Sequence, residues 1–307
     1  MPVFNTRKYI DKAIVSILDQ DFADFEFLIF DDGSTDGSLE RINYYAACDP
    51  RIKAFRRTHG GLTRLLNEGI KLAQGEFIAR MDSDDIAVPN RFSMQLAFLA
   101  KNHDYVAVGS QVKIIDPDGF PIGFTNHPLN HEEIEHIHLQ VDRSTVICHP
   151  TLLVKKSALC TVDGYRDNLE TAEDRDLYLR LALIGKLGNI NQPLIEYRRH
   201  CKTISHTKRK RQLDCILLCV NQARYQRGLE AQERKNQSKV VDEVNFYFSW
   251  ANRALESGFR KTALKLSIQL IMLDPIQSRH WELLTKILLG CRTVGWVKYI
   301  VNNFSHA

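Results

Sequence analysis

The sequence predicts an α/β fold in which a mostly parallel sheet is flanked by helices and is followed by an all-helical extension. Short apolar runs alternate with helical patterns through the first half of the chain, and beyond residue 206 the pattern becomes almost wholly helical. Alternating strands and helices are typical of a parallel sheet with helices packed on it. We therefore expect one large domain over residues 1–206 and a helical extension over residues 207–307.

The elements of the first half follow from their apolar spacing. Residues 9–20 carry apolar side chains three and four positions apart, which predicts a helix. Residues 25–30 form a nearly all-apolar run, which is typical of a buried strand. Residues 62–73 predict a second helix, and residues 76–81 predict a strand that runs directly into an acidic loop.

The later elements are mainly helical. Residues 91–101 predict a helix, residues 105–115 predict a strand, and residues 172–184 predict a helix that opens with two carboxylates. The extension is expected to contain three amphipathic helices, over residues 244–257, 259–273 and 278–289.

The composition is that of an ordinary soluble globular protein. The 307 residues are 44% hydrophobic and 25% charged, and the formal net charge is +4. This length supports a substantial buried core, and so mild a charge gives no argument for nucleic acid as a partner. We expect neither a signal peptide nor a membrane-spanning helix, because no apolar run reaches about 18 residues.

The seven cysteines are scattered along the chain and include no Cys-x-x-Cys pair. This pattern disfavours a disulfide framework and a zinc site. It is typical of proteins in a reducing compartment, so we expect a cytoplasmic location.

An acidic loop follows the predicted strand of residues 76–81. Asp82, Asp84 and Asp85 lie within four residues, and carboxylates so close repel each other when nothing pairs with them. A hard cation such as Mg²⁺ or Mn²⁺ relieves this repulsion, because it prefers oxygen ligands and often completes its shell with substrate phosphates. The alternative is a solvated acidic turn or a helix cap, and for this loop alone the two interpretations are about equally good.

Two further acidic pairs lie where a ligand could meet this loop. Asp31 and Asp32 end the strand of residues 25–30, and ligands bind at the carboxyl ends of parallel strands. Carboxylates there can accept hydrogen bonds from a base or a ribose, although the run alone is also an ordinary turn. Glu173 and Asp174 open a predicted helix, either as plain N-terminal charges or as a general base.

A basic and aromatic element, Tyr197-Arg198-Arg199-His200, closes the large domain. Arg198 can neutralise a diphosphate, and His200 can ligate a metal. A lone histidine is more often structural, so this element supports a function only together with the other three.

In this order the four elements resemble those of the family 2 glycosyltransferases, which have the Rossmann-like GT-A fold. The stretches that carry the resemblance are MPVFN, FLIFDDGSTDGS, NEGIKLAQGEFIARMDSDDIAVPNRF, HPTLLVKKSAL, AEDRDLYLRL and EYRRH. The resemblance covers roughly residues 2–206. It implies transfer of a sugar from a nucleotide-activated donor, as in the synthesis of bacterial polysaccharides and lipopolysaccharides.

The resemblance also implies which residues bind the donor. Pro2 and Phe4 match the loop that touches the nucleobase, and Asp31 and Asp32 match the pair that binds uracil and ribose. By this resemblance the donor is expected to be a UDP-hexose or a UDP-N-acetylhexosamine.

The implied metal is Mn²⁺ or Mg²⁺. Asp82 and Asp84 match the carboxylates that meet the metal and the sugar nucleotide, with Asp84 the better candidate for direct ligation. Asp85 extends this cluster, and His200 matches a histidine that can reach the same metal.

The implied chemistry is a single inverting displacement. Asp174, beside Glu173, matches the base that deprotonates the acceptor hydroxyl, and Gly164 matches a loop near the acceptor. The hydroxyl then attacks the anomeric carbon from the face opposite the leaving diphosphate. The expected acceptor is a saccharide or a lipid-linked sugar.

One departure from the family concerns the first strand. Family members begin with an apolar strand before the Pro-Val-Phe-Asn segment, whereas this sequence begins at Met1. Either the start is misassigned, or the sequence is truncated, or the strand is shortened; if the strand is truly absent, the floor under the base is weakened. The alternative function is a catalytically impaired sugar-nucleotide-binding or scaffold protein, which the retained Asp84, Asp174 and His200 disfavour. A sugar nucleotidylyltransferase is a weaker alternative, because no Gly-rich phosphate loop is present.

The basic run at residues 208–211 and the helical extension suggest peripheral contact with the inner face of the cell membrane. Basic segments are attracted to anionic lipid. A solvated charged linker is the competing interpretation, and for this run it is favoured by roughly two to one.

Overall fold

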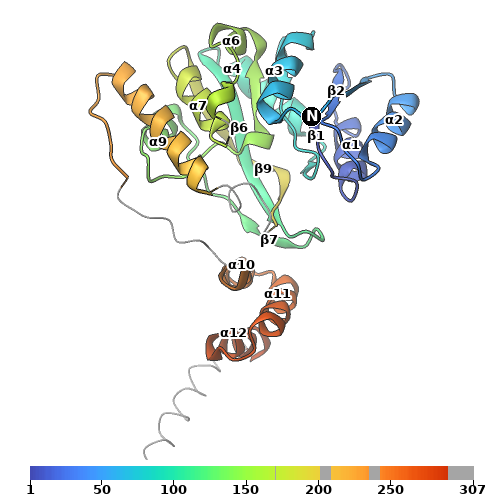
Figure 1. Ribbon diagram of the computed structural model, residues 1–307, viewed down its shortest axis with the longest axis vertical. Coiled ribbons are helices and arrows are strands. Elements are labelled where there is room, and N and C mark those ends of the chain that lie inside the picture. The colour runs from blue at the N-terminus through green and yellow to red at the C-terminus, as the bar shows by residue number, and fades with distance from the viewer. Residues whose placement is uncertain (170, 201–208, 235–242, 290–307) are drawn as a thin grey trace, which may run out of the picture. The chain divides into compact units, whose positions relative to one another are not determined.

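The computed structural model describes residues 1–169, 171–200, 209–234 and 243–289 (Figure 1). By their contacts these residues form two compact units. The first unit holds Met1–Val112, Thr125–Tyr197 and helix α9 (Arg209–Gln226). The second holds Lys113–Phe124, residues 198–200 and three helices. The domain boundary near residue 206 stays a prediction. By its contacts, helix α9 belongs to the first unit.

A three-stranded parallel sheet opens the first unit. Its strands β1 (Pro2–Val3), β2 (Phe27–Asp31) and β3 (Ile52–Arg56) lie in the order β1-β2-β3. Both pairs are parallel, so the carboxyl ends of the three strands lie at one edge. The helices that follow them are α1 (Ile10–Leu18), α2 (Ser38–Cys48) and α3 (Leu62–Leu72) (Figure 1). The predicted helices at 9–20 and 62–73 and the strand at 25–30 are confirmed.

The second sheet has the order β4-β8-β6-β9-β5. Its strands are β4 (Phe77–Ala79), β5 (Ile86–Ala87), β6 (Tyr105–Ile115), β8 (Leu153–Lys155) and β9 (Lys186–Arg198). The pairs β4–β8, β6–β8 and β5–β9 are antiparallel. The α/β class is therefore confirmed, but the strands are more mixed in direction than the alternation predicted. Parallel pairs need crossover connections, and the pattern of residues does not reveal which strands such connections join.

Helices α4 (Arg91–Lys101), α5 (His131–His138), α6 (Lys156–Thr161) and α7 (Glu173–Leu181) belong to the same unit. Leu177, Tyr178 and Leu181 of α7 are buried in one cluster with Val154 of β8 and Leu187 of β9. Burial of such side chains contributes roughly 1.5–3 kcal/mol each, so α7 is firmly held. The predicted helices at 91–101 and 172–184 are confirmed.

Helix α9 packs against the outer part of α7. Cys215, Cys219 and Val220 are buried in a cluster with Leu179 of α7 and Ala172 just before it. This cluster explains why α9 belongs to the first unit. Figure 1 shows α9 in orange beside the green α7.

The second unit combines a hairpin with three helices. Strand β7 (Pro121–Phe124) pairs with the end of β6, where Lys113 lies opposite Phe124. The helices are α10 (Glu243–Glu256), α11 (Arg260–Leu273) and α12 (Ser278–Leu289), as the sequence predicted. Lys265 of α11 donates to one carboxylate oxygen each of Asp116 and Asp118, at 2.6 Å, which ties α11 to the hairpin. In the part of the chain that the structure describes, each helix is too short or too polar to cross a bilayer.

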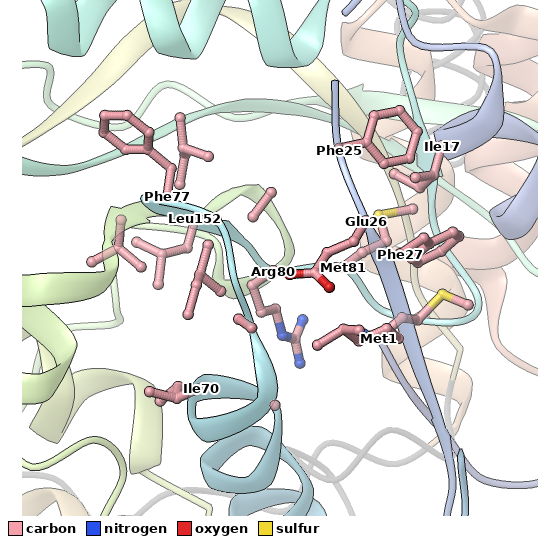
Figure 2. Close-up of a pocket in the computed structure, with 18 of the residues that line it drawn as sticks. Met1, Ile17, Phe25, Glu26, Phe27, Ile70, Phe77, Arg80, Met81 and Leu152 are labelled. Atoms are coloured by element: carbon pink, nitrogen blue, oxygen red, sulfur yellow. The ribbon is translucent and has the colours of Figure 1, made fainter. Parts of the chain in front are cut away.

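A cavity of about 820 Å³ lies beside β1 and is lined by residues of β2 and β4 (Figure 2). Met1, Phe27, Ile70 and Phe77 make its wall largely apolar, and the side chain of Arg80 also lines it. Strand β1 comprises Pro2 and Val3.

Candidate active site

The loop after β1 is bonded to the loops after β2 and β4. The amide of Asn5 donates to Ser34 Oγ at 3.0 Å, and Asn5 Oδ1 accepts from the amide of Thr35 at 2.9 Å. Thr6 Oγ1 donates to Ser83 Oγ at 3.0 Å. These bonds bring the segments around Phe4, Asp31 and Asp82 together at one edge of the fold, as the sequence predicted.

Asp31 and Asp32 are both buried, but their partners differ. Asp31 accepts a hydrogen bond from the amide of Ser34 at 3.2 Å. Asp32 accepts from the amides of Gly60 at 2.9 Å and Gly61 at 3.1 Å, just before α3, where the helix dipole favours a carboxylate. Asp32 therefore holds the start of α3 in place. Contact of either carboxylate with uracil or ribose stays a prediction.

The acidic loop brings three carboxylates together. One oxygen from each of Asp82, Asp84 and Asp85 lies within 4.8 Å of the others. Burial raises the pKa of Asp82, and the negative charge of Asp84 raises it further. Such an all-oxygen donor set fits a hard divalent cation, which would relieve the crowding of charge. The residues present therefore fit Mg²⁺ or Mn²⁺.

Arg80 is a buried cation that was not among the predicted site residues. Its guanidinium forms an ion pair with Asp82. Its positive charge partly opposes the rise that burial causes in the pKa values of Glu173 and Asp174. Arg91 is also buried, and its guanidinium donates a hydrogen bond to the backbone carbonyl of Arg80 at 2.7 Å. A charged residue within an otherwise apolar strand pattern was the signal that could have indicated Arg80.

The predicted base lies at the first turn of α7. Burial raises the pKa of Glu173 to about 7, and the nearby charge of Asp174 adds to this effect. Burial also raises the pKa of Asp174, although the Arg175 amide opposes this by donating to its Oδ1 at 2.7 Å. A general base works best with a pKa near the working pH, so this environment suits proton transfer.

Charges in the acidic loop and at the start of α7 affect the pKa values of the same buried side chains. Burial raises the pKa of Cys148 well above its usual value, and the charges of Asp85, Asp82 and Asp174 raise it further. Arg80 in turn pairs with Asp82 and lowers the pKa of Asp174. The two acidic elements therefore lie within electrostatic range of each other, as one site requires.

The loop before α7 is held by close packing. Gly164 has φ +58°, and a Cβ there would lie 2.6 Å from Asn67 Oδ1. That oxygen accepts from the amide of Tyr165, and Asn67 Nδ2 donates to the Tyr165 carbonyl, both at 2.8 Å. Tyr165 also bonds to His149 through its hydroxyl at 2.8 Å. Glycine is thus needed for this close approach, and the predicted place of Gly164 beside an acceptor stays a prediction.

Of the remaining predicted residues, Pro2 and Phe4 belong to the first unit, and Arg198 and His200 belong to the second. Pro2 lies in β1 opposite Phe30, and Phe4 is exposed just after this strand. Arg198 is buried, and its guanidinium donates to the carbonyls of Asp116 and Pro117. His200 follows β9 and belongs to the second unit. The diphosphate contact of Arg198 and the metal contact of His200 stay predictions.

The raised pKa of Glu173 predicts a pH-dependent stability. Between about pH 4.5 and 7 the Glu173 carboxyl group stays protonated in the folded protein but loses its proton in the unfolded chain. The free energy of unfolding therefore falls as the pH rises through that range. The Glu173→Gln variant should lose this dependence, on the order of 2 kcal/mol. Urea unfolding of both proteins at pH 5 and pH 7 measures it. Equal pH dependence in the two proteins would contradict the assignment.

Several known proteins have sequences similar to this chain. The family model described as glycosyl transferase family 2 matches residues 1–160. The Bacillus subtilis (strain 168) protein EpsE is 34% identical over 203 residues, which cover 64% of this chain and 71% of EpsE. The Escherichia coli O-antigen biosynthesis glycosyltransferase WbnJ is 32% identical over 66% of this chain and 79% of its own. Hyaluronan synthase of Pasteurella multocida is 27% identical, and the match covers 75% of this chain and 23% of the synthase.

Solved structures share the fold at lower identity. S. aureus TarS, in a complex with UDP-GlcNAc, matches 94% of this chain and 78% of its own with a TM-score of 0.53 and 17% identity. The mannosyltransferase PcManGT of Pyrobaculum calidifontis, in a complex with GDP-Man and Mn²⁺, matches 95% of this chain and 84% of its own, with a TM-score of 0.53 and 17% identity. These matches show a GT-A fold followed by carboxyl-terminal helices.

Proposed function

The chain belongs to glycosyltransferase family 2, and from this premise we propose that it transfers a sugar from a UDP-hexose or UDP-N-acetylhexosamine to a saccharide or lipid-linked acceptor. The observation that carries the proposal is that the buried Arg80 pairs with Asp82 of the acidic loop and that its charge also acts on the pKa of Asp174 at the start of α7. The UDP-GlcNAc bound by S. aureus TarS supports a UDP-sugar, and the role of WbnJ supports polysaccharide synthesis.

The acidic loop would hold the divalent cation. Asp84 and Asp82 are the proposed ligands, with Asp85 beside them, and the Mn²⁺ bound by PcManGT supports Mn²⁺ or Mg²⁺. When bound, such a cation offsets the negative charge that develops on a departing diphosphate. Arg80 keeps Asp82 in place through their ion pair, so the carboxylate is oriented before a ligand enters.

The carboxylates of α7 supply the proton transfer. Asp174 is the proposed base for the acceptor hydroxyl, and Glu173 shares its environment. A single base, with no second carboxylate acting as nucleophile, leads to inversion at the anomeric carbon. Two hydrogen bonds between Asn67 and the Tyr165 backbone hold the loop in front of α7.

A cytoplasmic enzyme at the inner face of the membrane fits the described surface. The described cysteines Cys48, Cys148, Cys160, Cys215 and Cys219 are free thiols, which suits a reducing compartment. Lys210 and Arg211 are exposed at the start of α9 and could approach anionic lipid. Lys208, the first residue of the basic run, lies outside the described residues.

Release of UDP from a panel of UDP-sugars tests the proposal. Purified protein with Mn²⁺ and no acceptor should hydrolyse its own donor slowly, and EDTA should stop the release. Nucleotide binding that depends on metal, without release from any donor, would instead support the catalytically impaired sugar-nucleotide-binding protein. Absence of both binding and release would contradict both functions.

A further inference from the structure

A pocket of the first unit lies at the start of α5, and we call it the α5 pocket. Its volume is about 470 Å³, which is within the range of sites that bind small molecules. The loop before α5 and the first turn of this helix supply its lining, which consists of Asn126, His127, Pro128, Leu129, Asn130 and Glu133. A pocket of this size has room for a sugar ring.

The polar groups of the α5 pocket suit an uncharged ligand that is rich in hydroxyl groups. The Asn126 amide and the His127 imidazole can each donate and accept hydrogen bonds, and the Glu133 carboxylate accepts them. Asn126 and Glu133 are exposed, and among the described residues their side chains make no hydrogen bond or ion pair. A hydroxyl group both donates and accepts, so it matches all three side chains. The negative charge of Glu133 would repel an anionic ligand.

Two buried amide side chains hold the backbone of this loop. Gln111 Nε2 donates to the His127 carbonyl, and Gln111 Oε1 accepts from the His127 amide, both at 2.8 Å. Asn189 Nδ2 donates to the Pro128 carbonyl at 2.8 Å. Both Gln111 and Asn189 are more than nine-tenths buried. Because these bonds go to the backbone, they fix the shape of the pocket without occupying its side chains.

Helix α5 connects the pocket with the surroundings of the proposed base. The helix has eight residues, so it spans about 12 Å from the pocket to His138 at its carboxyl end. The ring of His138 stacks on that of Tyr178, with centroids 5.5 Å apart. Burial raises the pKa of Tyr178, and the charge of Asp174, one turn earlier in α7, raises it further. An acceptor that reaches both the base and the pocket therefore needs more than one sugar.

We propose that the α5 pocket is a subsite for an uncharged sugar of an oligosaccharide acceptor, an inference that rests on the proposed function. The sugar bound here is not the one that receives the new linkage, because that sugar must lie at Asp174. Its hydroxyl groups bond to Asn126, His127 and Glu133. Its ring packs on Leu129, which is 39% exposed. The pocket then selects the acceptor chain, and Asp174 acts on the end of that chain.

Binding to an array of immobilised glycans tests this subsite. The labelled full chain, with Mn²⁺ and UDP present, should bind uncharged oligosaccharides more strongly than glycans that carry carboxylates or phosphates. A titration with the glycan that binds best then compares variants. Glu133→Ala should weaken its binding about tenfold, the size expected for a lost hydrogen bond to a charged group. Asn126→Ala should weaken it about fivefold, because a neutral hydrogen bond is lost.

Glu132→Ala is the matched control for Glu133→Ala. Glu132 is also an exposed carboxylate in the first turn of α5, but it does not line the pocket. This variant should bind glycans as the wild-type protein does. Without an acceptor, all three variants should release UDP from a donor at the wild-type rate, which shows that the fold and the donor site are intact. Slower release by Glu133→Ala or Asn126→Ala would contradict the inference.

Three results of the array and the titration would overturn the subsite. They are binding of no glycan, stronger binding of anionic glycans, and unchanged binding by both Glu133→Ala and Asn126→Ala. If the wild-type protein still releases UDP from a donor in that case, the proposed function stands without the subsite. If it neither binds nor releases UDP, the proposed function falls as well.

Discussion

Replacing Asp174 by asparagine should abolish sugar transfer and leave metal-dependent UDP binding intact. The amide keeps the size of the side chain and can still accept from the Arg175 amide, but it cannot take a proton from the acceptor hydroxyl. Loss of a general base costs about 10²–10⁴-fold in rate. Product formation under saturating donor, together with a UDP titration, measures the two effects separately.

The neighbouring carboxylates supply the controls for this prediction. Asp167→Asn changes an exposed carboxylate shortly before α7 and should transfer sugar at the wild-type rate. Normal transfer by Asp174→Asn would show that the base is assigned wrongly. If Glu173→Gln lost the rate instead, the base would be Glu173, whose pKa of about 7 also suits the task.

The Asp84→Ala variant should lose the part of UDP binding that depends on metal. Asp84 belongs to the cluster whose oxygens lie within 4.8 Å, and removing one carboxylate takes away both a ligand and a negative charge. We expect UDP affinity in the presence of Mn²⁺ to fall by at least about 100-fold, since outer-shell changes alone cost 10–100-fold in metal affinity. Calorimetric titration of UDP with Mn²⁺ and with EDTA measures the difference.

Two comparisons keep the Asp84 result specific. In EDTA the variant and the wild-type protein should bind UDP equally weakly, because the metal contribution is absent from both. Asp19→Ala, which removes an exposed carboxylate at the end of α1, should keep the full effect of Mn²⁺. An undiminished effect of Mn²⁺ in Asp84→Ala would contradict its role as a ligand.

Asp31 and Asp32 have different roles that their motif does not reveal. Asp31 and Asp32 are adjacent in a turn-like run, and their sequence offers no reason to separate their roles. In the fold, Asp32 accepts from two glycine amides and holds His59, whereas Asp31 bonds within its own turn. His59, which contacts Asp32, and Arg80, which pairs with Asp82, also lie at this edge of the fold, although the residue pattern assigned a role to neither.

The residue pattern was sufficient to predict seven of the helices and the resemblance to the family, but not helices α2, α5 and α6. Apolar spacing is a local property, so residues 91–101 and 278–289 could be recognised as helices without any knowledge of their neighbours. The tertiary structure alone decided the antiparallel pairing of β4 with β8, the ion pair of Arg80 with Asp82 and the clamp of His59 on Asp32. Each of these joins groups whose geometry depends on how the whole chain packs. Residue spacing records the period of an element, but not the partner that this element meets across the fold.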